Sequence, residues 1–182
     1  VDEKFSPMEP ALARRVLKRY GVEPPYLLFV STLEPRKNVC TLLRAFAAIA
    51  KDIPHKLVLV GGVGWRAGTI FRTIDELGIA DRIVRPGYVV YEELAAFYSL
   101  ADAFVFPTLY EGFGLALLEA QTCGCPVVTS NVTSVPEVVG DAAVCVDPYD
   151  VDALAGGVRR VIDDEAFRFD LAERGQARAR TF

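Results

Sequence analysis

The sequence is poor in the residue types on which many catalytic sites depend. Its 182 residues include one histidine, one tryptophan and one methionine. A Ser–His–Asp arrangement would need that single histidine, and His55 follows Pro54 in a polar turn with no evident catalytic partner. We therefore interpret His55 as an exposed loop residue. The chain also has no G-x-x-x-x-G-K-[ST] run, which excludes a P-loop at the level of motif.

Cysteine is scarce as well, with four residues that all have apolar neighbours. Cys123 and Cys125 are separated by one glycine, which is the wrong spacing for a zinc knuckle, and no second cysteine pair follows. No other metal ligands stand at a plausible spacing. We expect small buried thiols in a reducing compartment and no metal site.

Long apolar runs and an excess of positive charge are also missing. The apolar runs fall well short of the roughly 18 residues that cross a bilayer, and no secretory segment is recognisable. The net charge of −4 disfavours nucleic acid as a partner. Arginines near the C-terminus alternate with acidic residues, which predicts a solvated helix face.

Apolar residues are abundant, at 52% of the chain, and they fall in short runs. Strand-like runs cover residues 26–31, 56–60, 82–85, 102–106, 126–130 and 142–146. Helical patterns cover residues 11–20, 39–51, 65–77, 91–100, 114–123, 151–162 and 165–180. This alternation predicts an α/β fold, a Rossmann-like three-layer α/β/α sandwich with a six-stranded parallel sheet.

Parallel sheets bind ligands at the carboxyl ends of their strands. Five loops should share that rim: residues 32–38, 61–65, 87–90, 107–114 and 130–134. In the first loop, Arg36 and Lys37 offer two cations to a phosphate. The plainer alternative is a solvated surface pair.

The stretch from Tyr110 to Glu119 joins a strand to an apolar helix through a glycine-spaced turn. Such junctions present backbone N–H groups and a positive helix end to an anion. Glu111 lies in the turn, and Glu119 should lie about two turns into a buried helix, where a carboxylate needs a partner. The pattern alone leaves open that Glu111 merely favours the helix dipole and that Glu119 reaches solvent.

Residues 62–67 fit the dinucleotide fingerprint G-x-G-x-x-G/A in a formal sense. The run follows the second strand rather than the first, its interior holds Trp65 and Arg66, and no acid follows at the expected distance. We interpret Gly62 and Gly64 as allowing a tight bend or a close approach of the backbone to a ligand. An NAD-dependent dehydrogenase domain remains an alternative.

These motifs together resemble the C-terminal donor-binding domain of retaining glycosyltransferases of family 4, the group 1 enzymes with the two-domain GT-B fold. Glu111 and Glu119 match the E-x7-E signature of that family. Matching segments follow in the expected order: F-V-S-T-L-E-P-R-K-N (29–38), L-V-L-V-G-G (57–62), P-G-Y-V (86–89), Y-S-L-A-D-A-F-V-F-P-T (98–108), G-C-P-V-V-T-S (124–130) and V-P-E-V-V-G (135–140). The resemblance covers nearly the whole chain.

The resemblance implies a role for each matching residue. Glu111 would be the catalytic carboxylate beside the donor sugar, and Glu119 would accept hydrogen bonds from the ribose diol. Lys37 would bind the donor diphosphate, and Arg36 could replace the usual phosphate-binding arginine, whose place Thr32 takes here. Further donor contacts would come from Gly112, Phe113, Gly114 and Leu115 at the sugar and phosphate, and from Tyr88 and Val89 beside the nucleobase.

The same resemblance implies transfer of a hexosyl group, for example mannosyl or glucosyl, from a UDP- or GDP-linked sugar with retention and without metal or cofactor. Residues 1–10 would be the remnant of an interdomain linker and residues 11–182 the donor-binding domain. An N-terminal domain would supply the site for a lipid-linked or saccharide acceptor, so this half alone should be inactive. We expect a cytoplasmic protein of cell-envelope polysaccharide biosynthesis. Peripheral attachment to the inner membrane face, through the N-terminal domain, is left open. A nucleotide-sugar epimerase, a phosphorylase and a regulatory binding module are the alternatives with this fold.

Overall fold

Six short strands form one parallel sheet in the order β3-β2-β1-β4-β5-β6 in the computed structural model, which describes residues 2–182. Every neighbouring pair in the sheet is parallel. The strands are β1 (Tyr26–Val30), β2 (Lys56–Val60), β3 (Ile83–Gly87), β4 (Ala103–Phe106), β5 (Val127–Ser130) and β6 (Val144–Val146). The α/β class and the six-stranded parallel sheet predicted from the alternating pattern are confirmed.

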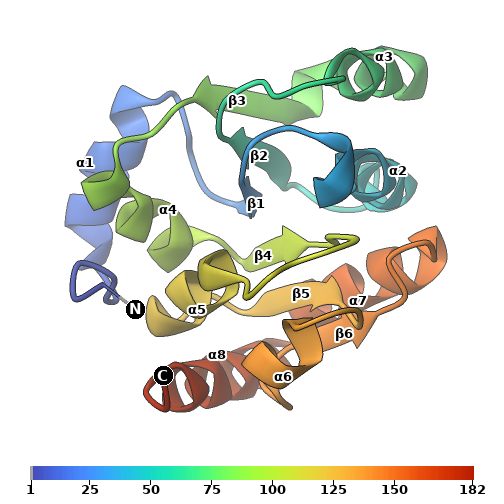
Figure 1. Ribbon diagram of the computed structural model, residues 1–182. Coiled ribbons are helices and arrows are strands. Elements are labelled where there is room, and N and C mark those ends of the chain that lie inside the picture. The colour runs from blue at the N-terminus through green and yellow to red at the C-terminus, as the bar shows by residue number, and fades with distance from the viewer. Residues whose placement is uncertain (1) are drawn as a thin grey trace.

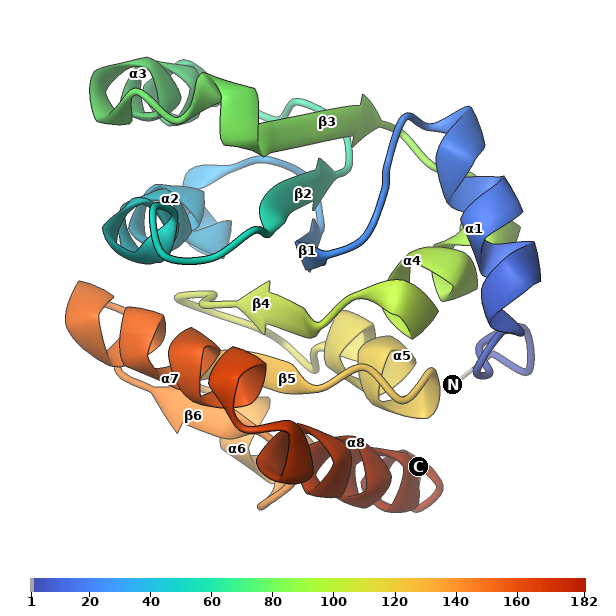
Figure 2. The same cartoon turned by 180° about the vertical axis from the view of Figure 1, so that it is seen from behind.

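Helices cover both faces of the sheet, which makes three layers (Figures 1 and 2). Helices α2, α3 and α7 lie on one face, and α1, α4 and α5 lie on the other, where α8 and α6 pack against α5. Their bounds are α1 (Pro10–Arg19), α2 (Val39–Ile49), α3 (Gly68–Leu77), α4 (Leu94–Leu100), α5 (Leu115–Thr122), α6 (Val135–Val139), α7 (Val151–Asp163) and α8 (Glu165–Ala179). Between residues 2 and 182, none of the helices has the length and apolar character needed to span a bilayer.

Some helix boundaries differ from the predicted ones for local reasons. Helix α3 begins at Gly68 rather than at residue 65, because Arg66 adopts a left-handed conformation (φ 54°) that a helix cannot include. Helix α5 begins at Leu115, so Glu119 lies about one turn into it and not two. The short helix α6 was not predicted from the pattern; it has Pro136 in its first turn.

Three 3-10 turns complete the chain: η1 (Pro35–Lys37), η2 (Ala80–Arg82) and η3 (Tyr91–Glu93). The first follows β1 and carries both predicted phosphate-binding cations. The third replaces the opening turn of the helix predicted over residues 91–100.

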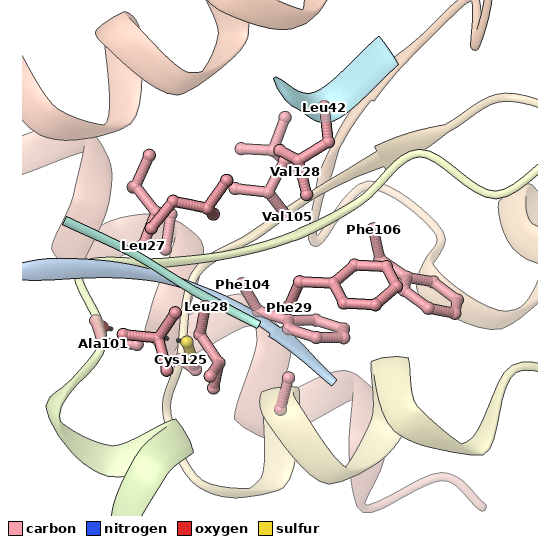
Figure 3. Close-up of a cluster of buried hydrophobic side chains, with 14 of the residues drawn as sticks. Leu27, Leu28, Phe29, Leu42, Ala101, Phe104, Val105, Phe106, Cys125 and Val128 are labelled. Atoms are coloured by element: carbon pink, nitrogen blue, oxygen red, sulfur yellow. Dashed lines mark hydrogen bonds between the residues drawn. The ribbon is translucent and has the colours of Figure 1, made fainter. Parts of the chain in front are cut away.

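The core lies between the central strands and the helices on each side (Figure 3). Helices cover both faces, so β1 and β4 are apolar in nearly every position and almost fully buried. The rings of Phe104 and Phe106 stack at 5.4 Å between centroids, and Tyr98 of α4 packs edge-on against Phe104 at 5.3 Å. At the other end of this row, the Lys37 ammonium lies 4.9 Å from the centroid of Phe106. The aromatic row therefore reaches the rim at the carboxyl ends of the strands.

The interpretation of His55 as an exposed loop residue is wrong. The side chain is only 5% exposed, and its Nε2 lies 3.0 Å from the Asp102 carboxylate. Arg82 explains the burial, because its guanidinium donates hydrogen bonds to the carbonyls of Ala50, Ile53 and His55 and holds this turn against the protein. His55 lies at the amino ends of the strands, away from the predicted ligand rim.

The four cysteines are free thiols. Cys123 and Cys125 are buried, and burial raises the pKa of both thiols, that of Cys123 to about 12. The prediction of buried thiols is confirmed for this pair, whereas Cys40 and Cys145 are half-buried. A thiol with so high a pKa is protonated at neutral pH and is a poor nucleophile.

The glycines after β2 serve the packing of two neighbouring loops. Gly61 has φ 135°, and a Cβ atom there would lie 2.1 Å from the Ser31 carbonyl oxygen. At Gly64 a Cβ atom would lie 2.7 Å from Cγ2 of Thr32. Gly61 and Gly64 therefore let the end of β2 press against the end of β1. The interpretation holds for Gly64 but not for Gly62, where a Cβ atom would meet nothing within 4 Å.

A pair of alanine substitutions tests this packing. We expect Gly61→Ala to lower the free energy of unfolding by about 2 kcal/mol or more, because alanine there collides with backbone and is strained at positive φ. Gly62→Ala is the matched control: a Cβ atom at Gly62 meets nothing within 4 Å. It should change stability by less than about 0.5 kcal/mol. Equal losses in urea unfolding of the two variants would contradict the assignment.

Candidate donor-binding site

The site lies where the loops after β1 and β4 meet. β1 and β4 are neighbours in the sheet, although β2 and β3 lie between them in the chain. The strand order reverses its direction at this pair, so their junction is the topological switch point. Open parallel sheets bind ligands at such a point. The backbone N–H of Leu109 donates to the Arg36 carbonyl at 2.9 Å and ties the two loops together.

Lys37 and Glu111 form a buried ion pair across this junction. The Lys37 Nζ lies 2.5 Å from Oε1 of Glu111, and the two side chains are 9% and 10% exposed. Thr108 donates its hydroxyl to the same carboxylate oxygen at 3.0 Å. The predicted lysine loop and the predicted acidic turn are thus in direct contact, and removing one partner of such a pair typically costs about 3–5 kcal/mol.

Arg36 lies on the solvent side of the same cluster. Its guanidinium donates to the Tyr110 carbonyl at 2.7 Å and to Glu34 at 2.8 and 3.1 Å, and it lies 3.6 Å from the Glu111 carboxylate. Thr32 is exposed at the start of the same loop. Arg36 therefore supplies a second cation beside Lys37, more open to solvent than the lysine.

Several polar residues that hold Glu111 and the loops around it were not identified as site residues from the sequence. The Glu111 backbone N–H donates to the Thr133 hydroxyl at 3.1 Å, and Ser134 donates to the Glu111 carbonyl at 3.0 Å. Asn38 bridges the carbonyls of Pro107 and Pro148 at 3.0 and 2.7 Å. The predicted rim position of residues 130–134 was the available signal, because a loop on this rim must pass close to Glu111.

The turn before α5 exposes the residues expected to meet a sugar or a phosphate. Gly112, Phe113 and Leu115 are exposed, whereas Gly114 caps the helix with φ 94°. No side chain from residues 2–182 caps the helix N-terminus, so its first N–H groups are open to an anion. The expectation that the helix is buried all round is wrong at Leu115, which is 59% exposed at the helix start.

Glu119 is partly buried on the α4 side of α5, with a tyrosine at each carboxylate oxygen. The Tyr98 hydroxyl donates to Oε2 at 3.2 Å, and the Tyr91 hydroxyl lies 3.5 Å from Oε1. Burial raises the pKa of Glu119, while the two tyrosine hydrogen bonds act in the opposite direction. These tyrosines provide the partners that a carboxylate on this apolar helix needs.

The loop after β3 brings the two predicted nucleobase contacts to the same rim. Tyr88 is 76% exposed, whereas the Val89 side chain is 3% exposed and packs into the core. Val89 can therefore meet a ligand only through its backbone. The loop continues directly into η3, which carries Tyr91, so it is linked to the surroundings of Glu119.

The raised pKa of Glu119 predicts a pH-dependent effect of Glu119→Gln. The folded state favours the protonated carboxyl of Glu119. This carboxyl therefore contributes its full stabilisation below its unfolded-state pKa of about 4.3, and the stabilisation is lost as pH rises through its higher folded-state pKa. Glutamine removes this titration and keeps an oxygen acceptor for Tyr98. The variant should therefore gain free energy of unfolding relative to the wild type between pH 4 and pH 7, measured by urea unfolding. A difference that does not change with pH would show that burial does not shift this group.

Three comparisons relate this chain to known proteins. The family model "Glycosyl transferases group 1" matches residues 15–178. O-antigen chain mannosyltransferase B from Escherichia coli is 41% identical over 98% of this chain and 48% of its own length. A GDP-mannose-dependent alpha-(1-6)-phosphatidylinositol monomannoside mannosyltransferase from Mycolicibacterium smegmatis is 33% identical over 89% of this chain and 45% of its own length.

Among solved structures, Anabaena Alr3699/HepE in complex with UDP and glucose superposes with a TM-score of 0.88 and 22% identity, over 98% of this chain and 50% of that one. This likeness concerns the fold. The chain spans about half the length of the curated relatives that it matches. Together, the family match and the identity to the mannosyltransferase show that the chain belongs to the group 1 glycosyltransferase family.

Proposed function

We propose that this chain is the donor-binding half of a hexosyltransferase that uses a nucleotide diphosphate sugar. The observation that carries the proposal is the Lys37–Glu111 pair at the topological switch point, beside the open N-terminus of α5. The names of the relatives support a mannosyl group as the group transferred. Epimerase, phosphorylase and dehydrogenase activities find no support in these relatives.

The diphosphate would bind where the two cations and a helix N-terminus come together on the rim. Lys37 and Arg36 both contact Glu111, which lies in the turn that leads into the uncapped start of α5. The cations and the helix N-terminus each favour negative charge, and together they can stabilise the diphosphate as the bond to the sugar breaks. We include metal independence in the proposal because these groups supply the positive charge that a metal ion would otherwise bring.

Glu111 would act at the sugar. Its carboxylate is fixed by Lys37 and Thr108, and its backbone by Thr133 and Ser134. A carboxylate so held can accept a hydrogen bond from a sugar hydroxyl and stabilise the positive charge that develops at the anomeric carbon. The backbone amides of Gly112, Phe113, Gly114 and Leu115 would contact the sugar and the phosphate.

Glu119 would recognise the ribose, and the loop after β3 would flank the base. The Glu119 carboxylate lies one helical turn beyond the phosphate-binding end of α5, on the side of η3 and α4. Tyr88 is exposed and Val89 offers its backbone. The mycobacterial relative is named GDP-mannose-dependent, which favours a guanine nucleotide here.

The complete reaction would need a partner domain. Residues 1–10, of which residue 1 lies outside the described range, would be the linker to an N-terminal domain. That domain would supply the binding site for a saccharide or lipid-linked acceptor. Closure of the two halves would exclude water from the sugar. This half alone would bind the donor and transfer little.

Titration calorimetry of the 182-residue chain with GDP and with UDP tests the site. We expect Lys37→Met and Glu119→Ala each to weaken binding of the preferred nucleotide by about tenfold or more, because each removes a charge-assisted contact. Lys51→Met is the matched control: this exposed lysine follows the opposite end of the helix that begins beside Lys37.

The control variant should bind as the wild type does. If the chain binds neither GDP nor UDP, the proposed function is contradicted. Binding that survives both site substitutions would contradict the assignment of Lys37 and Glu119.

The reaction itself is tested with the chain joined to its N-terminal acceptor domain. We expect an α-linked donor to give an α-linked product, read from the one-bond carbon–proton coupling at the anomeric centre by NMR, at a rate unchanged by EDTA. The anomeric carbon–phosphate oxygen bond breaks, the acceptor oxygen takes its place, and the acceptor proton passes to the leaving diphosphate. A β-linked product, or loss of activity with EDTA, would contradict retention or metal independence.

A further inference from the structure

We propose that Tyr98 is a positioning residue that orients Glu119 toward the ribose of the donor. The inference rests on the proposed role of Glu119 and extends it to a residue that touches no ligand itself. Its basis is the unequal anchoring of the two carboxylate oxygens: a buried tyrosine holds Oε2, and an exposed tyrosine approaches Oε1.

Tyr98 is fixed on all sides. It lies in α4, which packs against α5, and its side chain is fully buried. Phe104 of β4 packs edge-on against its ring at 5.3 Å, and Phe5 lies at 6.0 Å. A fully buried ring with these contacts cannot swing away without opening the core.

The Tyr98 hydroxyl is a permanent donor to Glu119. Burial raises its pKa well above the ordinary tyrosine value, and the nearby Glu119 charge acts in the same direction. The hydroxyl therefore keeps its proton at neutral pH and donates a hydrogen bond to Oε2. This contact occupies Oε2 and leaves Oε1 to the Tyr91 hydroxyl, which is 3.5 Å away.

Tyr91 holds the second oxygen much more loosely. It lies in the turn η3, it is 38% exposed, and its hydroxyl is 3.5 Å from Oε1, at the outer limit of a hydrogen bond. Its ring contacts are Phe5 at 5.1 Å and the Lys4 ammonium at 5.9 Å. A ribose hydroxyl can therefore replace Tyr91 at Oε1 while Tyr98 stays in place.

Holding Oε2 through Tyr98 while Oε1 stays available reduces the conformational entropy that Glu119 loses when the ribose binds. A glutamate free to rotate must be ordered when the diol binds, whereas Glu119 is already held by one oxygen. The effect should be specific to ligands with ribose hydroxyls. It should be absent for a nucleotide that lacks them.

The test compares GDP with 2′,3′-dideoxy-GDP on the wild-type chain and on Tyr98→Phe by titration calorimetry, or the UDP pair if UDP is preferred. We expect Tyr98→Phe to weaken GDP binding by about 3- to 10-fold, because one hydrogen bond to a charged group is lost. Binding of the dideoxy nucleotide should change by less than about twofold, because its contacts do not involve Glu119.

Two matched tyrosine variants separate positioning from stability. Tyr26→Phe removes a hydroxyl that is equally buried but donates to the Phe97 carbonyl at 2.7 Å. It should lower the melting temperature and leave the ratio of the two affinities unchanged. Tyr91→Phe should weaken GDP by less than about twofold, since ribose replaces its contact.

The outcomes distinguish this inference from the proposed function. An equal loss for both nucleotides in Tyr98→Phe, or a loss in Tyr91→Phe as large as in Tyr98→Phe, would overturn the positioning role. If Glu119→Gln weakens GDP binding but Tyr98→Phe does not, the positioning role is also overturned. The proposed function then still stands. A wild-type chain that binds neither GDP nor UDP would remove the proposed function and with it this inference.

Discussion

The buried pair of Lys37 and Glu111 is the interaction on which the rest of the site depends. Each charge would be costly so far from water, and each is tolerated because the other stands 2.5 Å away. The pair joins the loop after β1 to the loop after β4, which are distant in sequence. Arg36 and Thr108 also contact the Glu111 carboxylate, so the pair lies at the centre of the contacts in front of α5.

The aromatic core couples this pair to the second acid. Phe106 lies under the Lys37 ammonium, Phe104 stacks on Phe106, and Tyr98 packs on Phe104 while donating to Glu119. Both acids are thus positioned through one continuous row of rings. A volume change in that row would displace both acids together, since close-packed interiors transmit small displacements.

The sequence was sufficient for the sheet and for placing the loops of Lys37 and Glu111 on one rim, because alternation and strand-end position are local signals. It did not predict the ion pair between the two side chains. It was insufficient for His55, whose burial depends on Arg82 folding back across 27 residues onto the His55 carbonyl. Tyr98 was visible only as part of a family motif, since nothing local marks a tyrosine as the partner of an acid on another helix. Roles that depend on contacts between distant elements need the coordinates.

Without a donor, the cluster is electrically balanced. Lys37 and Arg36 face Glu111 and Glu34, so two cations are matched by two carboxylates. A diphosphate would bring new negative charge to this place, and the cations must divide their contacts between it and Glu111. The open N-terminus of α5 then becomes the additional source of positive potential. The proposed donor binding by this half should therefore be weak, because part of the attraction replaces contacts that already exist.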